Sequence, residues 1–203
     1  MAEQETSTYK IRYATERDVP VILHLIRELA IYEKALHEVF ATEQSLRESL
    51  SFPLDPKDLD KGFTEGYAKT LLICPVPGST ASGGSEQHHP DIHKDGEEEV
   101  AGMALYFHNY STWHARPGIY LEDLFVHPTY RGRGYGTALI RALARECQRL
   151  NCRRLEWSVL KWNTPSIDFY QGASVGATRM EEWVGMRVEG ERLERLSKMV
   201  EGN

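Results

Sequence analysis

A glycine-rich turn between a predicted strand and a predicted helix constrains this chain more than any other feature. The segment reads YRGRGYGT from Tyr130 to Thr137. Glycine alternates through it, at Gly132, Gly134 and Gly136. Glycine allows backbone conformations closed to other residues, so several N–H groups can converge on the positive end of the following helix. Because Arg131 and Arg133 add positive charge, the turn predicts an anion site that suits phosphate.

Two familiar phosphate-binding patterns do not fit this turn. A nucleotide-triphosphate loop needs a lysine and a Ser or Thr after its last glycine, and the turn has Thr137 but no lysine. A dinucleotide fingerprint is spaced G-x-G-x-x-G, whereas these glycines run G-x-G-x-G. From the motif alone, a glycine-rich turn without a ligand is the remaining alternative.

The rest of the chain predicts alternating strands and helices. The predicted strands cover Tyr9 to Ala14, residues 66–74, Val100 to Tyr110, Ile119 to Val126, Arg154 to Leu160 and Trp183 to Val188. The predicted helices run from Thr15 to about Lys34, from Thr42 to near Pro53, from about Gly134 to Leu150, from about Pro165 to Gln171, and from Glu191 to Val200. A turn at Pro117-Gly118 is expected to join the third and fourth strands. This order indicates an α/β or α+β sandwich.

The 203 residues suit one domain over residues 9–200, after a flexible N-terminus at 1–8. Residues 75–99 are rich in Gly, Ser, Pro and charge, so they predict a mobile insertion. Its histidines, His88, His89 and His93, fit a polar loop better than a metal cluster, and we expect no metal.

Composition excludes several other classes of function. The net charge of −6 argues against nucleic-acid binding. Three cysteines, Cys74, Cys147 and Cys152, match no metal spacing and favour a reducing compartment. The N-terminus has no apolar core for a signal peptide, and no apolar run is long enough to span a membrane. A cytoplasmic protein without a nucleic-acid or membrane partner is expected.

The spacing Arg131-x-x-Gly134-x-Gly136 after Val126-His127-Pro128 resembles the coenzyme A pyrophosphate motif of the GNAT superfamily. The segments YKIRYATERDVPVILHLIRELAIYE, YLEDLFVHPTYRGRGYGTALI and VLKWNTPSIDFY are similar to those of the diamine N-acetyltransferases, which act on spermidine, spermine or thialysine. The resemblance covers residues 9 to about 200. It implies a mixed, twisted sheet of about six to seven strands flanked by helices, with middle strands that splay to admit the pantetheine arm. It also implies acetyl-CoA as cosubstrate and a homodimer.

Acetyl transfer to an amine needs a group that removes the ammonium proton, because roughly one alkylamine in a thousand is neutral at pH 7. Glu122, in the strand YLEDLFV, is the candidate base. Period two places it on one strand face with Tyr120 and Leu124 and places Leu121, Asp123 and Phe125 on the other. An edge-strand acid, or one paired with an arginine, is the alternative from sequence alone. The resemblance assigns the proton acceptor to Glu122 and leaves Asp123 a structural role.

Tyr170, in the predicted helix PSIDFYQ, is the candidate general acid for the departing thiolate, because a phenol has a suitable pKa. From sequence alone, a tyrosine that packs its ring beside Phe169 is the alternative, and the resemblance favours the catalytic role. Backbone N–H groups after Glu122 could stabilise the thioester oxygen. The complete predicted coenzyme set is Leu124, Phe125, Val126, Arg131, Gly132, Arg133, Gly134, Tyr135, Gly136, Thr137, Asn163 and Ser166.

The acceptor predicted for such a site is the primary amine of a small cation, such as a polyamine, a diamine or an amino acid. The resemblance points to Tyr32, Glu33, Glu122, Glu182 and Trp183 as acceptor-binding residues, since carboxylates and aromatic faces attract ammonium groups. A protein or peptide lysine acetyltransferase is one alternative. A non-catalytic acyl-CoA-binding module is another.

Overall fold

A computed structural model describes residues 8–76 and 98–199 of the chain, in two compact units. The first unit is Met1–Asn163 and the second is Thr164–Asn203. Residues 1–7 of the predicted flexible N-terminus, most of the 75–99 insertion and its three histidines lie outside the described residues.

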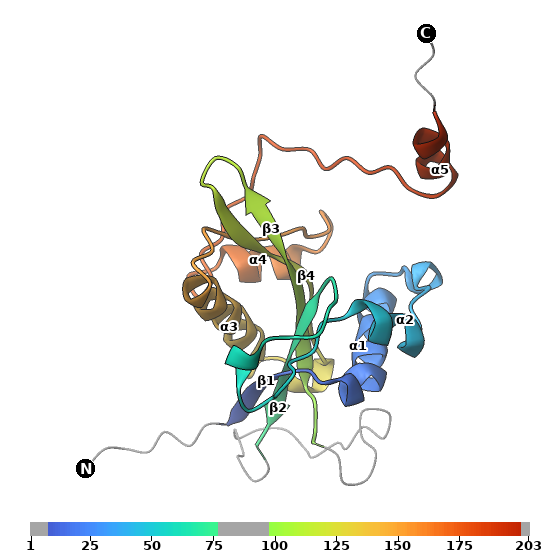
Figure 1. The fold of residues 1–203 in the computed structure, drawn as a ribbon. Coiled ribbons are helices and arrows are strands. Elements are labelled where there is room, and N and C mark those ends of the chain that lie inside the picture. The colour runs from blue at the N-terminus through green and yellow to red at the C-terminus, as the bar shows by residue number, and fades with distance from the viewer. Residues whose placement is uncertain (1–7, 77–97, 200–203) are drawn as a thin grey trace, which may run out of the picture. The chain divides into compact units, whose positions relative to one another are not determined.

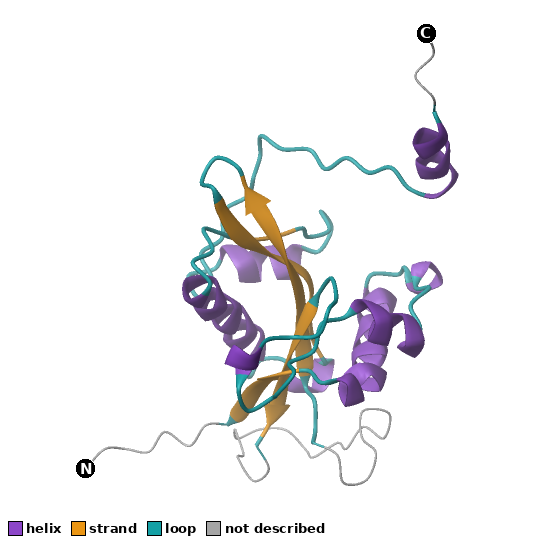
Figure 2. Ribbon diagram, viewed as in Figure 1, coloured by secondary structure: helices purple, strands orange, loops and turns teal. Residues whose placement is uncertain are grey.

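The first unit is built on a mixed sheet of five strands in the order β1-β2-β3-β4-β5 (Figure 2). The strands are β1 (Tyr9–Tyr13), β2 (Lys69–Pro75), β3 (Gly102–Ser111), β4 (Arg116–Val126) and β5 (Leu155–Trp157). The first four pair antiparallel, and β5 pairs parallel to β4. This confirms a mixed α/β fold, with fewer strands than the six to seven predicted.

Three helices of the first unit cover the two faces of this sheet. They are α1 (Val19–Tyr32), α2 (Glu43–Ser49) and α3 (Tyr135–Arg149), and Figure 1 shows α3 on the opposite side of the sheet from α1 and α2. The backbone N–H of Thr15 donates to Asp18 Oδ2 at 2.7 Å ahead of α1, and Ser45 N donates to Thr42 Oγ1 at 3.1 Å at the start of α2. The predicted cap at Thr42 is therefore formed, whereas Thr15 precedes a short 3-10 turn at Glu16–Asp18 and its side chain makes no cap hydrogen bond.

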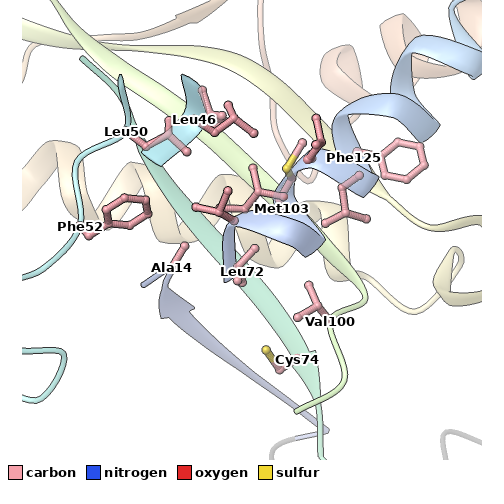
Figure 3. Packing of buried hydrophobic residues seen from close by; sticks show 14 residues of the cluster. Ala14, Leu46, Leu50, Phe52, Leu72, Cys74, Val100, Met103 and Phe125 are labelled. Atoms are coloured by element: carbon pink, nitrogen blue, oxygen red, sulfur yellow. The ribbon is translucent and has the colours of Figure 1, made fainter. Parts of the chain in front are cut away.

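The main hydrophobic core lies between α1, α2 and one face of the sheet (Figure 3). The strands contribute the buried side chains of Leu72, Cys74, Met103, Leu105 and Phe125. The helices contribute Val19, Ile22, Leu23, Leu25 and Leu46. Burial of each large aliphatic side chain stabilises the fold by about 1.5–3 kcal/mol, so this cluster fixes α1 against β3 and β4.

The turn between β3 and β4 is not at Pro117-Gly118, as predicted, but at residues 112–115. Pro117 and Gly118 lie within β4, opposite Tyr110 and Asn109. A Cβ on Gly118 would lie 2.3 Å from Asn109 Oδ1 and 3.2 Å from the Arg154 carbonyl oxygen, so close packing and not a turn favours glycine here. Proline is tolerated near the beginning of a strand, where fewer ladder hydrogen bonds are lost.

The second unit contains α4 (Thr164–Gln171) and α5 (Gly190–Lys198). None of its described residues is buried. The strand predicted over Trp183 to Val188 is not formed, which corrects the prediction. These residues have apolar alternation but form no backbone ladder with another strand of the described chain, and a strand needs that pairing. Within the described residues, no helix combines the length and apolar character required to cross a membrane.

Candidate active site

Glu122 lies at a β-bulge in the middle of β4. Leu105 pairs with Asp123 and the next residue, Tyr106, pairs with Leu121, so Glu122 is the extra residue on β4. Bulges re-aim a side chain and often occur beside active sites. The Glu122 side chain is exposed. A carboxylate in this position is accessible to an incoming molecule, as a general base must be.

The bulge changes the strand faces that period two predicts. Asp123 lies opposite Leu105, which packs in the core against α1, so Asp123 lies on the α1 face. Leu121 lies opposite Tyr106, on the other face. The prediction that Leu121 and Asp123 share a face is therefore wrong, because the extra residue between them reverses the alternation.

Beyond the bulge, one backbone edge of β4 is open. The parallel ladder to β5 covers only Ile119 to Leu121, whereas Glu122 to Val126 pair within the described chain with β3 alone. An open strand edge can form hydrogen bonds with the amide groups of an extended ligand. The ladder ends here because β5 ends at Trp157, and the splay of the middle strands that the resemblance implies stays a prediction.

The neighbouring acids share a strongly negative environment. Burial raises the pKa of Asp123 to about 6, and the carboxylates of Glu122 and Glu33 contribute to the increase. Glu33 follows the last residue of α1, and partial burial raises its pKa as well. Three carboxyl groups from α1 and β4 therefore lie close enough to interact, in a position that favours a cationic ligand.

The glycine-rich turn has the conformation that its sequence predicts. Gly132 has φ of 77° and Gly134, the N-cap of α3, has φ of 78°, which is the left-handed region that favours glycine. A Cβ on either glycine would have no atom within 4 Å, so open space borders the turn. Gly134, the N-cap residue, makes no side-chain cap hydrogen bond to the first N–H groups of α3. Free donors at the positive end of a helix favour an anion.

Tyr32 lies at the end of α1 and links several predicted site residues. Its hydroxyl donates to Asn163 Oδ1 at 3.0 Å, and Asn163 is only 5% exposed. The Arg131 guanidinium lies 5.4 Å from the centre of the Tyr32 ring. The Trp162 ring lies 5.9 Å away on a tilt. Sequence reasoning missed Trp162, although its place directly before Asn163 was the available signal.

The remaining predicted site residues belong to the second unit. Ser166 and Tyr170 lie half-buried on α4, and the Tyr170 and Phe169 ring centres are 5.2 Å apart. Glu182 and Trp183 are exposed, and Trp183 is 69% exposed. Thus Glu122, Asp123, Glu33, Tyr32 and the glycine-rich turn form one set, while the residues on and after α4 form another.

The first unit thus contains an exposed acid at a strand bulge, an open strand edge among its described residues, and a glycine-rich turn at the start of α3. The sequence profile of the acetyltransferase (GNAT) family matches residues 59–173, which include all three features. The chain belongs to this family. It is an N-acetyltransferase, and members of the family use acetyl-CoA as cosubstrate.

Curated relatives match this family member over most of its length. L-ornithine N5-acetyltransferase of Arabidopsis thaliana is 33% identical, over 94% of this chain and 88% of the relative. Thialysine N-epsilon-acetyltransferase of Mus musculus is 35% identical, over 93% of this chain and 96% of the relative.

Solved structures agree on the fold. An integron cassette protein from the mobile metagenome of V. cholerae superposes with a TM-score of 0.65 at 23% identity, over 95% of this chain and 99% of that protein. An aminoglycoside acetyltransferase from an uncultured soil metagenomic sample gives a TM-score of 0.61 at 16% identity, over 90% and 96% of the two chains.

Proposed function

We propose that this N-acetyltransferase transfers the acetyl group of acetyl-CoA to the primary amine of a small cationic acceptor. The observation that carries the proposal is the exposed Glu122 at the β4 bulge, next to Asp123 and near Glu33, with the open strand edge directly after it. The names of the relatives, which act on L-ornithine and thialysine, support an amino-acid amine, a diamine or a polyamine as acceptor.

The residues present fit acetyl-CoA. The exposed turn from Arg131 to Gly134 and the uncapped N–H groups of α3 suit the diphosphate, with Arg133 adding positive charge. The open edge of β4 after Glu122 suits the amide groups of the pantetheine arm. A backbone N–H from Leu124, Phe125 or Val126 would stabilise the negative charge that develops on the thioester oxygen.

In the proposed reaction, Glu122 accepts a proton from the ammonium group, directly or through water. The neutral nitrogen then attacks the acetyl carbon, the carbon–sulfur bond breaks, and the nitrogen loses a second proton as the amide forms. Tyr170 gives its phenol proton to the departing thiolate and is restored by that second proton, while Glu122 releases the first proton to solvent. The sequence position of Tyr170 in the NTPSIDFY segment of α4 supports this role.

We place the acceptor against Tyr32, Glu33 and Glu122, with Glu182 and Trp183 as further acceptor-binding residues. At pH 7 most Asp123 side chains are ionised, because the pKa is about 6. The carboxylates at 33, 122 and 123 therefore attract a cation with more than one positive charge more strongly than a simple monoamine.

The protein is proposed to act as a cytoplasmic homodimer. The described residues of 164–199 include no buried side chain, yet they expose Trp183, Val184, Met186, Val188, Leu193, Leu196 and Met199. Apolar side chains of this kind suit a subunit interface, and together with the family resemblance they support the proposed homodimer. The free thiols of Cys74 and Cys147, both buried, suit a reducing compartment.

The test is acetylation of a panel of amines by the purified chain. Acetyl-CoA is supplied with L-ornithine, thialysine, spermidine, putrescine and a lysine-containing peptide, release of the thiol is followed, and the product is identified by mass spectrometry. Glu122→Gln and Tyr170→Phe should each lower kcat by about 10²- to 10⁴-fold while coenzyme A still binds in calorimetry. Acetylation of the peptide alone would replace the proposed acceptor class. Coenzyme A binding without any acetylated product would support a binding module instead.

A further inference from the structure

The two arginines of the glycine-rich turn make different contacts. Arg131 Nε donates to the carbonyl oxygen of Val126 at 2.9 Å. Its guanidinium carbon lies 5.4 Å from the centre of the Tyr32 ring and 5.7 Å from that of Phe125. These contacts join the turn to the end of β4 and to the end of α1, which are two different elements of the first unit.

Arg133 makes its contacts within its own segment. Its Nη2 donates to the Thr129 carbonyl oxygen at 3.3 Å, and its guanidinium lies 5.3 Å from the centre of the Tyr130 ring. Both arginines are exposed. The two arginines therefore differ in the elements that they contact. Arg131 contacts β4 and α1, whereas Arg133 contacts only residues of its own segment among the contacts given above.

Tyr32 links Arg131 to the residues proposed to bind the acceptor. It precedes Glu33, whose carboxylate interacts with that of Asp123. The Tyr32 hydroxyl is held by Asn163 Oδ1 at 3.0 Å. The ring is therefore fixed at its hydroxyl by Asn163 and contacted by the guanidinium of Arg131. Without Arg131, the ring would lose a cation–π contact that restricts it.

We propose that Arg131 is a positioning residue for the acceptor: it holds Tyr32, and through it Glu33, in place beside Glu122. The role goes beyond the phosphate contact expected of an arginine in this turn, and it rests on the function proposed above. On this proposal, Arg133 and the backbone amides of the turn mainly bind the coenzyme, and Arg131 mainly positions residues that bind the acceptor.

The test separates affinity for coenzyme from use of the acceptor. Arg131→Met, Arg131→Lys and Arg133→Met are compared with Arg27→Met, which removes an exposed arginine from α1. Coenzyme A affinity is measured by calorimetry, and kcat and KM are measured with L-ornithine and with thialysine. Arg131→Met should raise the acceptor KM about tenfold with kcat changed by less than about threefold, and the rise in acceptor KM should exceed any rise in the coenzyme A Kd. Arg131→Lys should recover part of the loss, because the ammonium keeps the charge near the Tyr32 ring.

The two controls should behave differently from Arg131→Met. Arg133→Met should weaken coenzyme A binding and leave the acceptor KM near that of the wild type. Arg27→Met should change neither quantity. If Arg131→Met weakens coenzyme A binding as Arg133→Met does and leaves the acceptor KM unchanged, Arg131 is a coenzyme ligand only and the proposal is wrong.

A double-mutant cycle with Tyr32→Leu tests the route of the effect. If Arg131 acts through the Tyr32 ring, Arg131→Met should change the acceptor KM by less than about twofold in the Tyr32→Leu background. Additive effects would overturn the proposal even if both single variants raise KM. Absence of acetyl transfer by the wild-type protein would instead refute the proposed function, so the two failures are distinguishable.

Discussion

Asp123→Asn should stabilise the protein at high pH and leave its stability at low pH unchanged. Burial, with the nearby charges of Glu122 and Glu33, raises the pKa of Asp123 from its ordinary value of 3.8 to about 6. The native state therefore binds a proton more tightly than the unfolded chain. A tenfold difference in proton affinity corresponds to about 1.4 kcal/mol, so ionised Asp123 costs the native state up to about 3 kcal/mol.

The sign of the pH dependence follows from the direction of that change. Between about pH 4 and pH 6 the native state holds more protons than the unfolded state, so the contribution of Asp123 to stability falls as the pH rises. Above about pH 6 the whole cost is present. Asparagine has nearly the same shape without the charge, so the variant should gain about 1 to 3 kcal/mol at about pH 8 and close to nothing at about pH 4.

Urea denaturation at several pH values measures this difference. Coincident transitions by fluorescence and circular dichroism establish whether the unfolding free energies are well defined. Asp60→Asn is the matched control, because Asp60 is an exposed aspartate far from Asp123 in the sequence, and it should give less than about 0.5 kcal/mol at every pH. A gain that is the same at all pH values, or none at high pH, would show that Asp123 does not carry this electrostatic cost.

Three further outcomes are expected. Glu122→Gln should lower the pKa of Asp123, because it removes a neighbouring negative charge. An NMR titration of the Asp123 carboxyl carbon measures this pKa. The same pKa in the variant and the wild type would show that the two acids do not interact. Gly134→Ala should cost about 1–2 kcal/mol of stability, because its φ of 78° disfavours alanine although the surrounding space is open. Gly185→Ala is the control, because Gly185 also has open space around it but no positive φ. Equal costs for the two variants would contradict the argument. Leu139→Ala should cost about 2–5 kcal/mol in urea denaturation, because Leu139 is fully buried on α3, and a loss below about 1 kcal/mol would contradict that packing.

The features that the sequence predicted best are those controlled by local chemistry. The cap at Thr42 and the left-handed glycine at 134 both act within a few residues, so their sequence signals are complete. The buried side chains of Leu139 and Leu143 repeat at helical spacing, and α3 was predicted close to its observed limits. The periodicity of a single helix is enough to predict such a face.

The incorrect predictions depended on distant partners. Gly118 was interpreted as a turn residue, but glycine is favoured at this position by close packing. Asn109 approaches it from the neighbouring strand, and Arg154, which precedes β5, approaches it as well. Trp183 to Val188 have the alternation of a strand, yet a strand also requires a neighbour to pair with, which a local pattern does not supply. Trp162 was missed because it contacts Tyr32, and the two residues are too far apart in the sequence for a local pattern to show the contact.

The bulge at Glu122 can be understood from the packing of β4 on both faces of the sheet. Leu121 and Phe125 are four residues apart, and strict alternation would put them on the same face. Leu121 instead lies opposite Tyr106 on one face, while Phe125 lies opposite Met103 in the core against α1 on the other. Both side chains are buried, so one extra residue must lie between them.

The extra residue does not have to pack with Leu121 on one face or with Phe125 on the other. A polar side chain is therefore tolerated at this position. Glu122 occupies the position and is exposed between two buried apolar layers. Asp123, displaced by one step, lies on the α1 face, where its charge interacts with that of Glu33. The register shift that satisfies both hydrophobic layers therefore also gathers the acids on which the proposed chemistry depends. A variant that restored regular alternation by deletion of Glu122 would move Leu121 or Phe125 out of its core, so the candidate base is coupled to the packing of the sheet.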